Sequence, residues 1–222
     1  MKFCKEFTPV VLLLAIPAFG QGFLIAPALY AVQGAPFSAV VESAWDGSDT
    51  APPGWNRSRE MRDAAGRERL EMPTVEDAAA NGEMARVTIY DFGKEQIVVL
   101  DTVSRTARIT PMTHVGRTMT LTPSTTPTQG ACPVFPGEVA LGTRMIVGLE
   151  TCGHQLVQTF QKHGVPKNEV RDLWLSRTYA MPLAATREDE RLGTVHQEVV
   201  EFNPQDPDPA LFEIPLGYRV LR

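Results

Sequence analysis

Apolar and polar residues alternate in short runs along most of the chain after residue 36, and turn residues interrupt the runs about every ten positions. From Phe37 to Trp45, apolar side chains recur at alternate positions, which is the period of a β-strand with one buried face. The runs 57–62 and 67–72 flank the turn 63–66 and predict a hairpin with one heavily charged face. The remaining runs predict a meander over 86–91, 95–101 and 105–110, further strands or hairpins at 138–147, 149–162, 171–187 and 193–202, and a last strand at 219–221.

Helical signals are few. The 18 prolines and 17 glycines favour turns over long helices. Residues 73–83, which are acidic and rich in alanine, are expected to form a short helix or a loop. Asp208 is placed to cap a single helical turn over 210–212, with Pro209 at the first position. The pattern therefore predicts a mainly β, antiparallel domain.

Residues 111–137 interrupt the strand pattern. The segment is rich in threonine and proline and has no sustained apolar period. Loops of this length inside a domain are usually covers over a functional site or disordered segments.

The N-terminus has the parts of a secretory signal peptide. Lys2 and Lys5 precede an apolar run, and small residues follow it. We expect residues 1–31 to be a cleaved signal, with the cut after residue 20, 28 or 31, and residues 32–222 to form a single β domain in the periplasm or outside the cell. A retained membrane anchor is the alternative, although Pro17 and Pro27 interrupt the run. A cleaved signal would leave no transmembrane span.

Two of the three cysteines remain after such processing. Cys4 precedes the apolar run, whereas Cys132 and Cys152 lie in the expected mature domain. An even pair in an oxidising compartment favours a disulfide, and two separate thiols are the alternative. The pair would join the exit of the 111–137 loop to the sheet.

Charge and motifs narrow the function classes. The whole chain has a net charge of −5, and loss of Lys2, Lys5 and Glu6 would make the remainder more negative by one unit. A net acidic chain does not favour nucleic acid as a partner. Motifs for a nucleophilic serine, for a phosphate loop and for paired redox cysteines do not occur in the sequence, and no cofactor is expected.

The nearest approach to a metal motif is the pair His196 and Glu198. On a strand they would share one face, but zinc needs at least a third ligand, so a solvent-facing strand position is the simpler interpretation. No catalytic residue and no metal ligand is assigned. An enzyme stays a third interpretation, favoured only if a polar cluster forms around His154 or His196.

Several segments together resemble a family of exported bacterial proteins whose activity is uncharacterised. The order of these segments is what makes the resemblance specific. The matching segments are RDAAGRERLE at 62–71, VTIYD at 87–91 with LD at 100–101 and RTA at 105–107, LGTRMIVG at 141–148, WLS at 174–176, RLG at 191–193, and PDPALFEIP at 207–215 with GY at 217–218.

The strand succession of that family is similar to the outer-membrane lipoprotein carriers of the LolA and LolB type. The resemblance implies a curved antiparallel sheet, a half-barrel, with few short helices and an acyl-binding concave side. The helices that fill the sheet in the carriers are not found in this sequence, and the 111–137 loop could cover the sheet instead. The expected function is non-enzymatic binding or carriage of an apolar or lipidic ligand.

A structural or protein-interaction module of the cell envelope is the alternative function. The charged hairpin face formed by Arg67, Arg69 and Glu71 would then contact an envelope protein, whereas a plain solvated face is the simpler interpretation.

Overall fold

One large sheet contains most of the described residues. The computed structural model describes residues 31–49, 52–73, 84–112, 119–120, 132, 137–162, 165–189 and 192–221. The sheet has twelve strands in the order β14-β7-β6-β5-β4-β3-β2-β13-β12-β11-β10-β9. Its strands are β2 (Phe37–Trp45), β3 (Gly54–Arg62), β4 (Glu68–Pro73), β5 (Met84–Asp91), β6 (Gln96–Asp101), β7 (Thr106–Pro111), β9 (Glu138–Ile146), β10 (Leu149–Lys162), β11 (Val165–Ser176), β12 (Met181–Asp189), β13 (Gly193–Asn203) and β14 (Arg219–Leu221).

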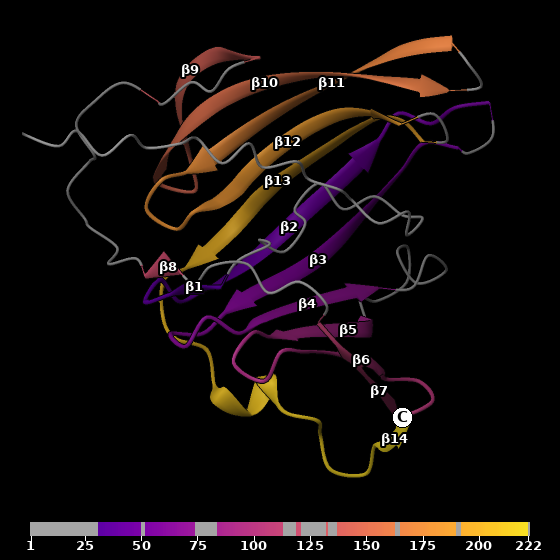
Figure 1. Cartoon of the computed structure of the whole chain (residues 1–222), viewed down its shortest axis with the longest axis vertical. Coiled ribbons are helices and arrows are strands. Elements are labelled where there is room, and N and C mark those ends of the chain that lie inside the picture. Colours follow the sequence, from indigo (N-terminus) through magenta and orange to yellow (C-terminus); the bar gives the residue numbers. More distant parts are fainter. Residues whose placement is uncertain are drawn as a thin grey trace, which may run out of the picture.

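The sheet is curved and open. All neighbouring strands are antiparallel except β14, which pairs with β7 in parallel. Figure 1 shows the strands arching from β9 at one end to β7 and β14 at the other, and these ends do not pair with each other. The expected mainly β half-barrel is therefore confirmed.

Sequence patterns located most strands closely. The strand 37–45, the hairpin around 63–66 and the three-stranded meander are confirmed, as is the capped helical turn η1 (Pro209–Phe212), in which Asp208 accepts a hydrogen bond from the Ala210 amide. One boundary was wrong, because β11 begins at Val165 rather than near residue 171. Pairing with the end of β10 extends this strand through Pro166, where the local sequence favours a turn.

Several predicted segments lie wholly or largely outside the described residues. They are residues 1–30, which contain most of the expected signal peptide, residues 74–83, and most of the 111–137 loop. Within that loop, β8 (Met119–Thr120) is a short strand that pairs in parallel with β1 (Val32–Gln33), a pairing that the sequence did not predict.

The expected disulfide between Cys132 and Cys152 is present. Its sulfur atoms are 2.06 Å apart, and the two residues are separated by 20 positions. Cys152 lies in β10 and is buried. The bond thus fixes residue 132, near the end of the predicted loop, to the sheet.

Removal of this bond is expected to lower the free energy of unfolding by about 3 kcal/mol, because closing a loop of this length restricts the unfolded chain. The measurement is urea unfolding of the protein with and without reductant. A Cys132→Ala/Cys152→Ala variant is the control, since reductant should not change its unfolding. If reductant shifts both proteins equally, or neither, the bond does not stabilise the fold in this way.

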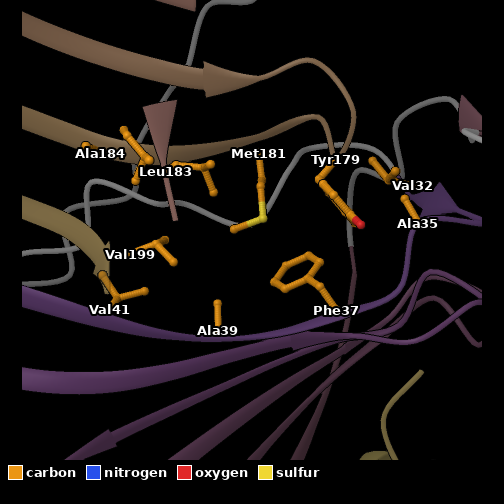
Figure 2. Close-up of a cluster of buried hydrophobic side chains, with 11 residues drawn as sticks. Val32, Ala35, Phe37, Ala39, Val41, Tyr179, Met181, Leu183, Ala184 and Val199 are labelled. Carbon is orange, nitrogen blue, oxygen red and sulfur yellow. The ribbon is translucent and has the colours of Figure 1, made fainter. Parts of the chain in front are cut away.

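Two hydrophobic clusters lie on opposite faces of the sheet. The concave cluster joins β2, β12 and β13 to residues 31–36, and Figure 2 shows its side chains pointing toward one another between the two halves of the arch. The convex cluster lies on β5–β7 beneath the C-terminal segment. Its buried members are Val87, Ile89, Val98, Leu100, Ala107 and Phe212.

Candidate functional site

The concave face combines an apolar half with a polar half. On β2, the alternating residues Phe37, Ala39 and Val41 point to the concave side, where Val199 of β13 and Leu183 of β12 join them. All five are buried. This half is an ordinary hydrophobic core.

Three aromatic rings close one end of the apolar half. The Phe37 ring stacks on Phe202 with centroids 5.5 Å apart and meets Tyr179 edge-on at 6.2 Å. Tyr179 and Phe202 are themselves 4.7 Å apart. Such offset and edge-on contacts are the favoured geometries of aromatic pairs, so this end of the face has a defined shape.

The strand register carries the same face onto β3, β4 and β5, where it becomes polar. Phe37 lies opposite Arg62 and Ala39 opposite Glu60. Arg62 in turn lies opposite Glu68, which lies opposite Tyr90. Side chains directly opposite in a ladder share a face. We call this set the concave polar row, and its members are Ser58, Glu60, Arg62, Glu68, Thr88 and Tyr90.

Arg62 holds the polar row to the aromatic end. Its side chain is 1% exposed, and its Nε donates to Glu68 Oε1 at 3.2 Å. Its Nη1 donates to the Tyr179 carbonyl oxygen at 2.7 Å, and its guanidinium lies 4.9 Å from the centre of the Phe37 ring. A buried cation with a carboxylate, a carbonyl and a ring around it is well compensated.

The two carboxyl groups of the row have raised pKa values. Burial and the nearby negative charge of Glu68 raise the pKa of Glu60 to about 8, although Arg62 opposes the shift. Burial also raises the pKa of Glu68, and Arg62 again lowers it in part. Glu60 is therefore mostly protonated and neutral at neutral pH.

One oxygen of the row has no partner. Glu68 is 3% exposed, and its Oε2 accepts no hydrogen bond although Oε1 is bound to Arg62. Nearly all buried polar groups in proteins are paired, and an unpaired buried acceptor costs about 1–3 kcal/mol. Clusters of buried titratable groups with perturbed pKa values are frequent at functional sites.

Half-buried apolar side chains lie beside the row on the same face. Leu70 lies between Glu60 and Thr88 in the ladder, Val99 is opposite Thr88, and Ile97 is opposite Tyr90. All three are half-buried, and none belongs to either hydrophobic cluster. The concave face thus offers apolar surface next to buried polar groups.

The convex face of the same hairpin contacts the C-terminal segment. Arg67 donates to Asp63 at 2.6 Å and to Glu213 at 2.9 Å, and its guanidinium lies 4.9 Å from the Phe212 ring. Arg69 donates to Glu71 at 2.7 Å and to the Leu211 carbonyl oxygen. Of the three residues expected to form a charged face, Arg67 and Arg69 therefore hold residues 211–213 of their own chain, and Glu71 accepts from Arg69. Their side chains are at most 18% exposed.

Arg67→Lys is expected to lower the free energy of unfolding by about 1–2 kcal/mol, because a lysine keeps the charge but loses the forked donor and the ring contact. Denaturant unfolding measures the loss. Arg57→Lys, at an exposed convex ion pair with Glu42, is the matched control and should change stability by less than about 0.5 kcal/mol. Equal effects at both positions would argue against a special role for Arg67.

The histidines singled out from the sequence do not come together. His154 is buried, and its Nδ1 lies 3.0 Å from Glu138 Oε2. His196 is exposed, and its Nδ1 lies 3.2 Å from Thr186 Oγ1. Within the described part of the chain, no group of three or more His, Cys, Asp or Glu is placed to hold a metal ion, and no helix is long and apolar enough to cross a membrane.

A hollow of about 290 Å³ lies on the convex side, where β13 is irregular between Val199 and Glu201. It is open, and its position is separate from the concave polar row. Its lining residues are Ser38, Ala39, Val40, Arg59, Met61, Glu201, Phe202 and Asn203.

The concave polar row was not predicted from the sequence, although its signal was present. The same alternation that placed Arg67, Arg69 and Glu71 on one face of the hairpin places Glu60, Arg62 and Glu68 on the other. Alternation alone does not show whether a charged face of a hairpin is buried, so the sequence pattern did not indicate which of the two faces would be covered.

Known proteins resemble this chain in structure rather than in sequence. No protein-family model and no curated protein matches the sequence. An uncharacterized conserved protein from Thermus thermophilus is similar in structure, with 14% identity, a TM-score of 0.48, and coverage of 85% of this chain and 91% of that one. MucB shares 12% identity at a TM-score of 0.43, over 83% of this chain and 58% of MucB.

A LolA superfamily protein and a putative outer membrane lipoprotein-sorting domain also occur among the similar structures, as the sequence resemblance predicts. A LolA superfamily protein from Nitrosomonas europaea shares 9% identity at a TM-score of 0.38, over 81% of this chain and 90% of that protein. The likeness is one of strand arrangement. The fold and the site together define an open antiparallel half-barrel with an amphipathic concave face.

Proposed function

We propose that this chain is an exported, periplasmic binding protein that shelters an apolar or lipidic molecule against its concave face without transforming it. The observation that carries the proposal is the half-buried surface of Leu70, Ile97 and Val99, which lies outside both hydrophobic clusters. Burial of each ligand methylene there would contribute about 0.8 kcal/mol. In the half-barrel, this apolar surface lies on the concave side only.

Binding of an apolar fluorescent dye tests the proposal. Val99→Glu on the concave side is expected to weaken dye binding at least about tenfold, because a charge would replace apolar contact surface. Val40→Glu is the matched control, since Val40 is a half-buried valine of the sheet that lines the convex hollow. No dye binding by the wild type, or equal effects of the two substitutions, would contradict the proposal.

A second candidate function is an interaction module of the cell envelope. The open edge of the sheet favours it, because β9 pairs only with β10 among the described strands and exposes Val139 and Met145. An unpaired edge can accept a strand from another protein. Crosslinking in cells through residue 139 would give one dominant protein partner under this candidate, and no such partner under the first.

A further inference from the structure

We propose that the concave polar row receives the uncharged, hydrogen-bonding head of an amphiphile, a hydroxyl-bearing or amide-bearing group, while the tail lies on the neighbouring apolar side chains. This inference rests on the proposed function, since it needs a ligand at the concave face. It adds the chemical class of the ligand and its orientation.

The arrangement of the face fits a head and a tail. Glu60 and Glu68 are buried in the row, and Leu70 and Val99 lie next to them on the same face. A polar head in contact with the two carboxyl groups would leave a tail free to follow Leu70 and Val99. Ligand sites commonly combine apolar lining with a few placed polar groups in this way.

The unpaired oxygen of Glu68 favours a ligand head that carries a hydrogen-bond donor. Oε2 is buried and accepts no hydrogen bond, and the nearest cation, Arg62, already donates to Oε1 and to the Tyr179 carbonyl oxygen. A hydroxyl or amide of a ligand can donate to Oε2. A carboxylate or phosphate head cannot, and it would be repelled by the charge on Glu68.

Glu60 and the surrounding charges favour an uncharged head. Because burial raises the pKa of Glu60 to about 8, its neutral carboxyl group can both donate and accept at neutral pH. With Arg62 paired to Glu68, the centre of the row carries no net charge. Further cations share this face, among them Arg86, Arg108, Arg171 and Arg187. Arg86 and Arg108 are exposed on β5 and β7, and Arg171 and Arg187 lie on β11 and β12 beyond the apolar half, so none of them is opposite Glu68 in the ladder.

Competition between matched amphiphiles tests the inference. Monododecanoylglycerol and dodecanoate carry the same tail with an uncharged and an anionic head, and each is titrated against the dye-loaded full chain at neutral pH. The glycerol ester is expected to bind about tenfold more tightly than the acid, which is the effect of one well-made hydrogen bond to a charged acceptor.

Two variants at one position locate the head. Glu60→Leu removes one of the two carboxyl groups without breaking the Arg62–Glu68 ion pair. It is expected to lower the preference for the glycerol ester without abolishing it, because Glu68 still accepts a donor and repels the acid. Glu60→Gln keeps a donor and an acceptor and should preserve the preference. Both variants should still bind the dye, which shows that they are folded.

The outcomes separate this inference from the proposed function. Dodecanoate binding as tightly as the glycerol ester, or a preference unchanged in Glu60→Leu, would overturn the inference and leave the proposed function standing. The first result would indicate that the head lies at the cations of this face instead. Failure of the dye and both amphiphiles to bind would overturn both.

Discussion

Replacement of Arg62 by methionine is expected to lower the free energy of unfolding by about 3–5 kcal/mol. Methionine keeps an unbranched apolar stem in the place of the arginine stem, so the loss comes mainly from the missing charge and hydrogen bonds. Without Arg62, the buried Glu68 loses its counter-ion, and the Tyr179 carbonyl oxygen loses a donor. Denaturant unfolding at neutral pH measures the change.

A second substitution tests whether the uncompensated charge of Glu68 causes this loss of stability. Glu68→Gln in the Arg62→Met background removes the stranded charge and should recover at least about 1 kcal/mol. Glu68→Gln alone should destabilise, because it leaves the buried charge of Arg62 without a carboxylate. Arg59→Met is the control, since Arg59 is 55% exposed and lies 3.7 Å from Glu71 on the convex face. Strict additivity of the two substitutions would contradict the ion-pair explanation.

Glu60→Gln is expected to make the protein more stable in alkaline solution and to flatten its dependence on pH. The pKa of Glu60 is raised by burial and by Glu68 from 4.5 to about 8 in the folded state. Between these values the folded protein holds a proton that the unfolded chain has released. Stability therefore falls as pH rises, by up to about 1.4 kcal/mol per pH unit, and the fall ends above pH 8.

The test is the free energy of unfolding of the wild type and the variant between pH 5 and pH 9. Glutamine does not titrate, so the variant should lose the part of the decline that Glu60 causes. Glu68, whose pKa burial also raises, should contribute a decline of the same sign to both proteins. Glu150→Gln, at an exposed position of β10, should behave as the wild type does. Parallel curves for the wild type and Glu60→Gln would show that Glu60 does not titrate as proposed.

Most of the fold could be predicted from alternation and turn residues. The strand 37–45, the hairpin at 63–66 and the capped turn after Asp208 follow from local patterns that the tertiary structure preserves. The start of β11 could not be predicted in this way, because Val165–Val170 is a strand only through its pairing with β10. The parallel pairing of β1 with β8 joins segments far apart in sequence and has no local signal.

The site was harder to predict than the fold. Alternation separates the two faces of a hairpin but does not say which face is covered. The charged residues Arg67 and Arg69 drew attention to the convex face, where they bind the C-terminal segment. Glu60 and Glu68 became candidates only once their burial and the unpaired oxygen of Glu68 were seen.

The most direct test of the central claim is the intact mass of the protein purified from its native envelope, measured under native and denaturing conditions. The account predicts that the native mass exceeds the denatured mass by that of one small amphiphile, and that the excess is reduced in Val99→Glu but not in Val40→Glu. Fragmentation of the released species would identify its head and tail. Equal native and denatured masses of the wild type would contradict a sheltered ligand and favour the interaction module.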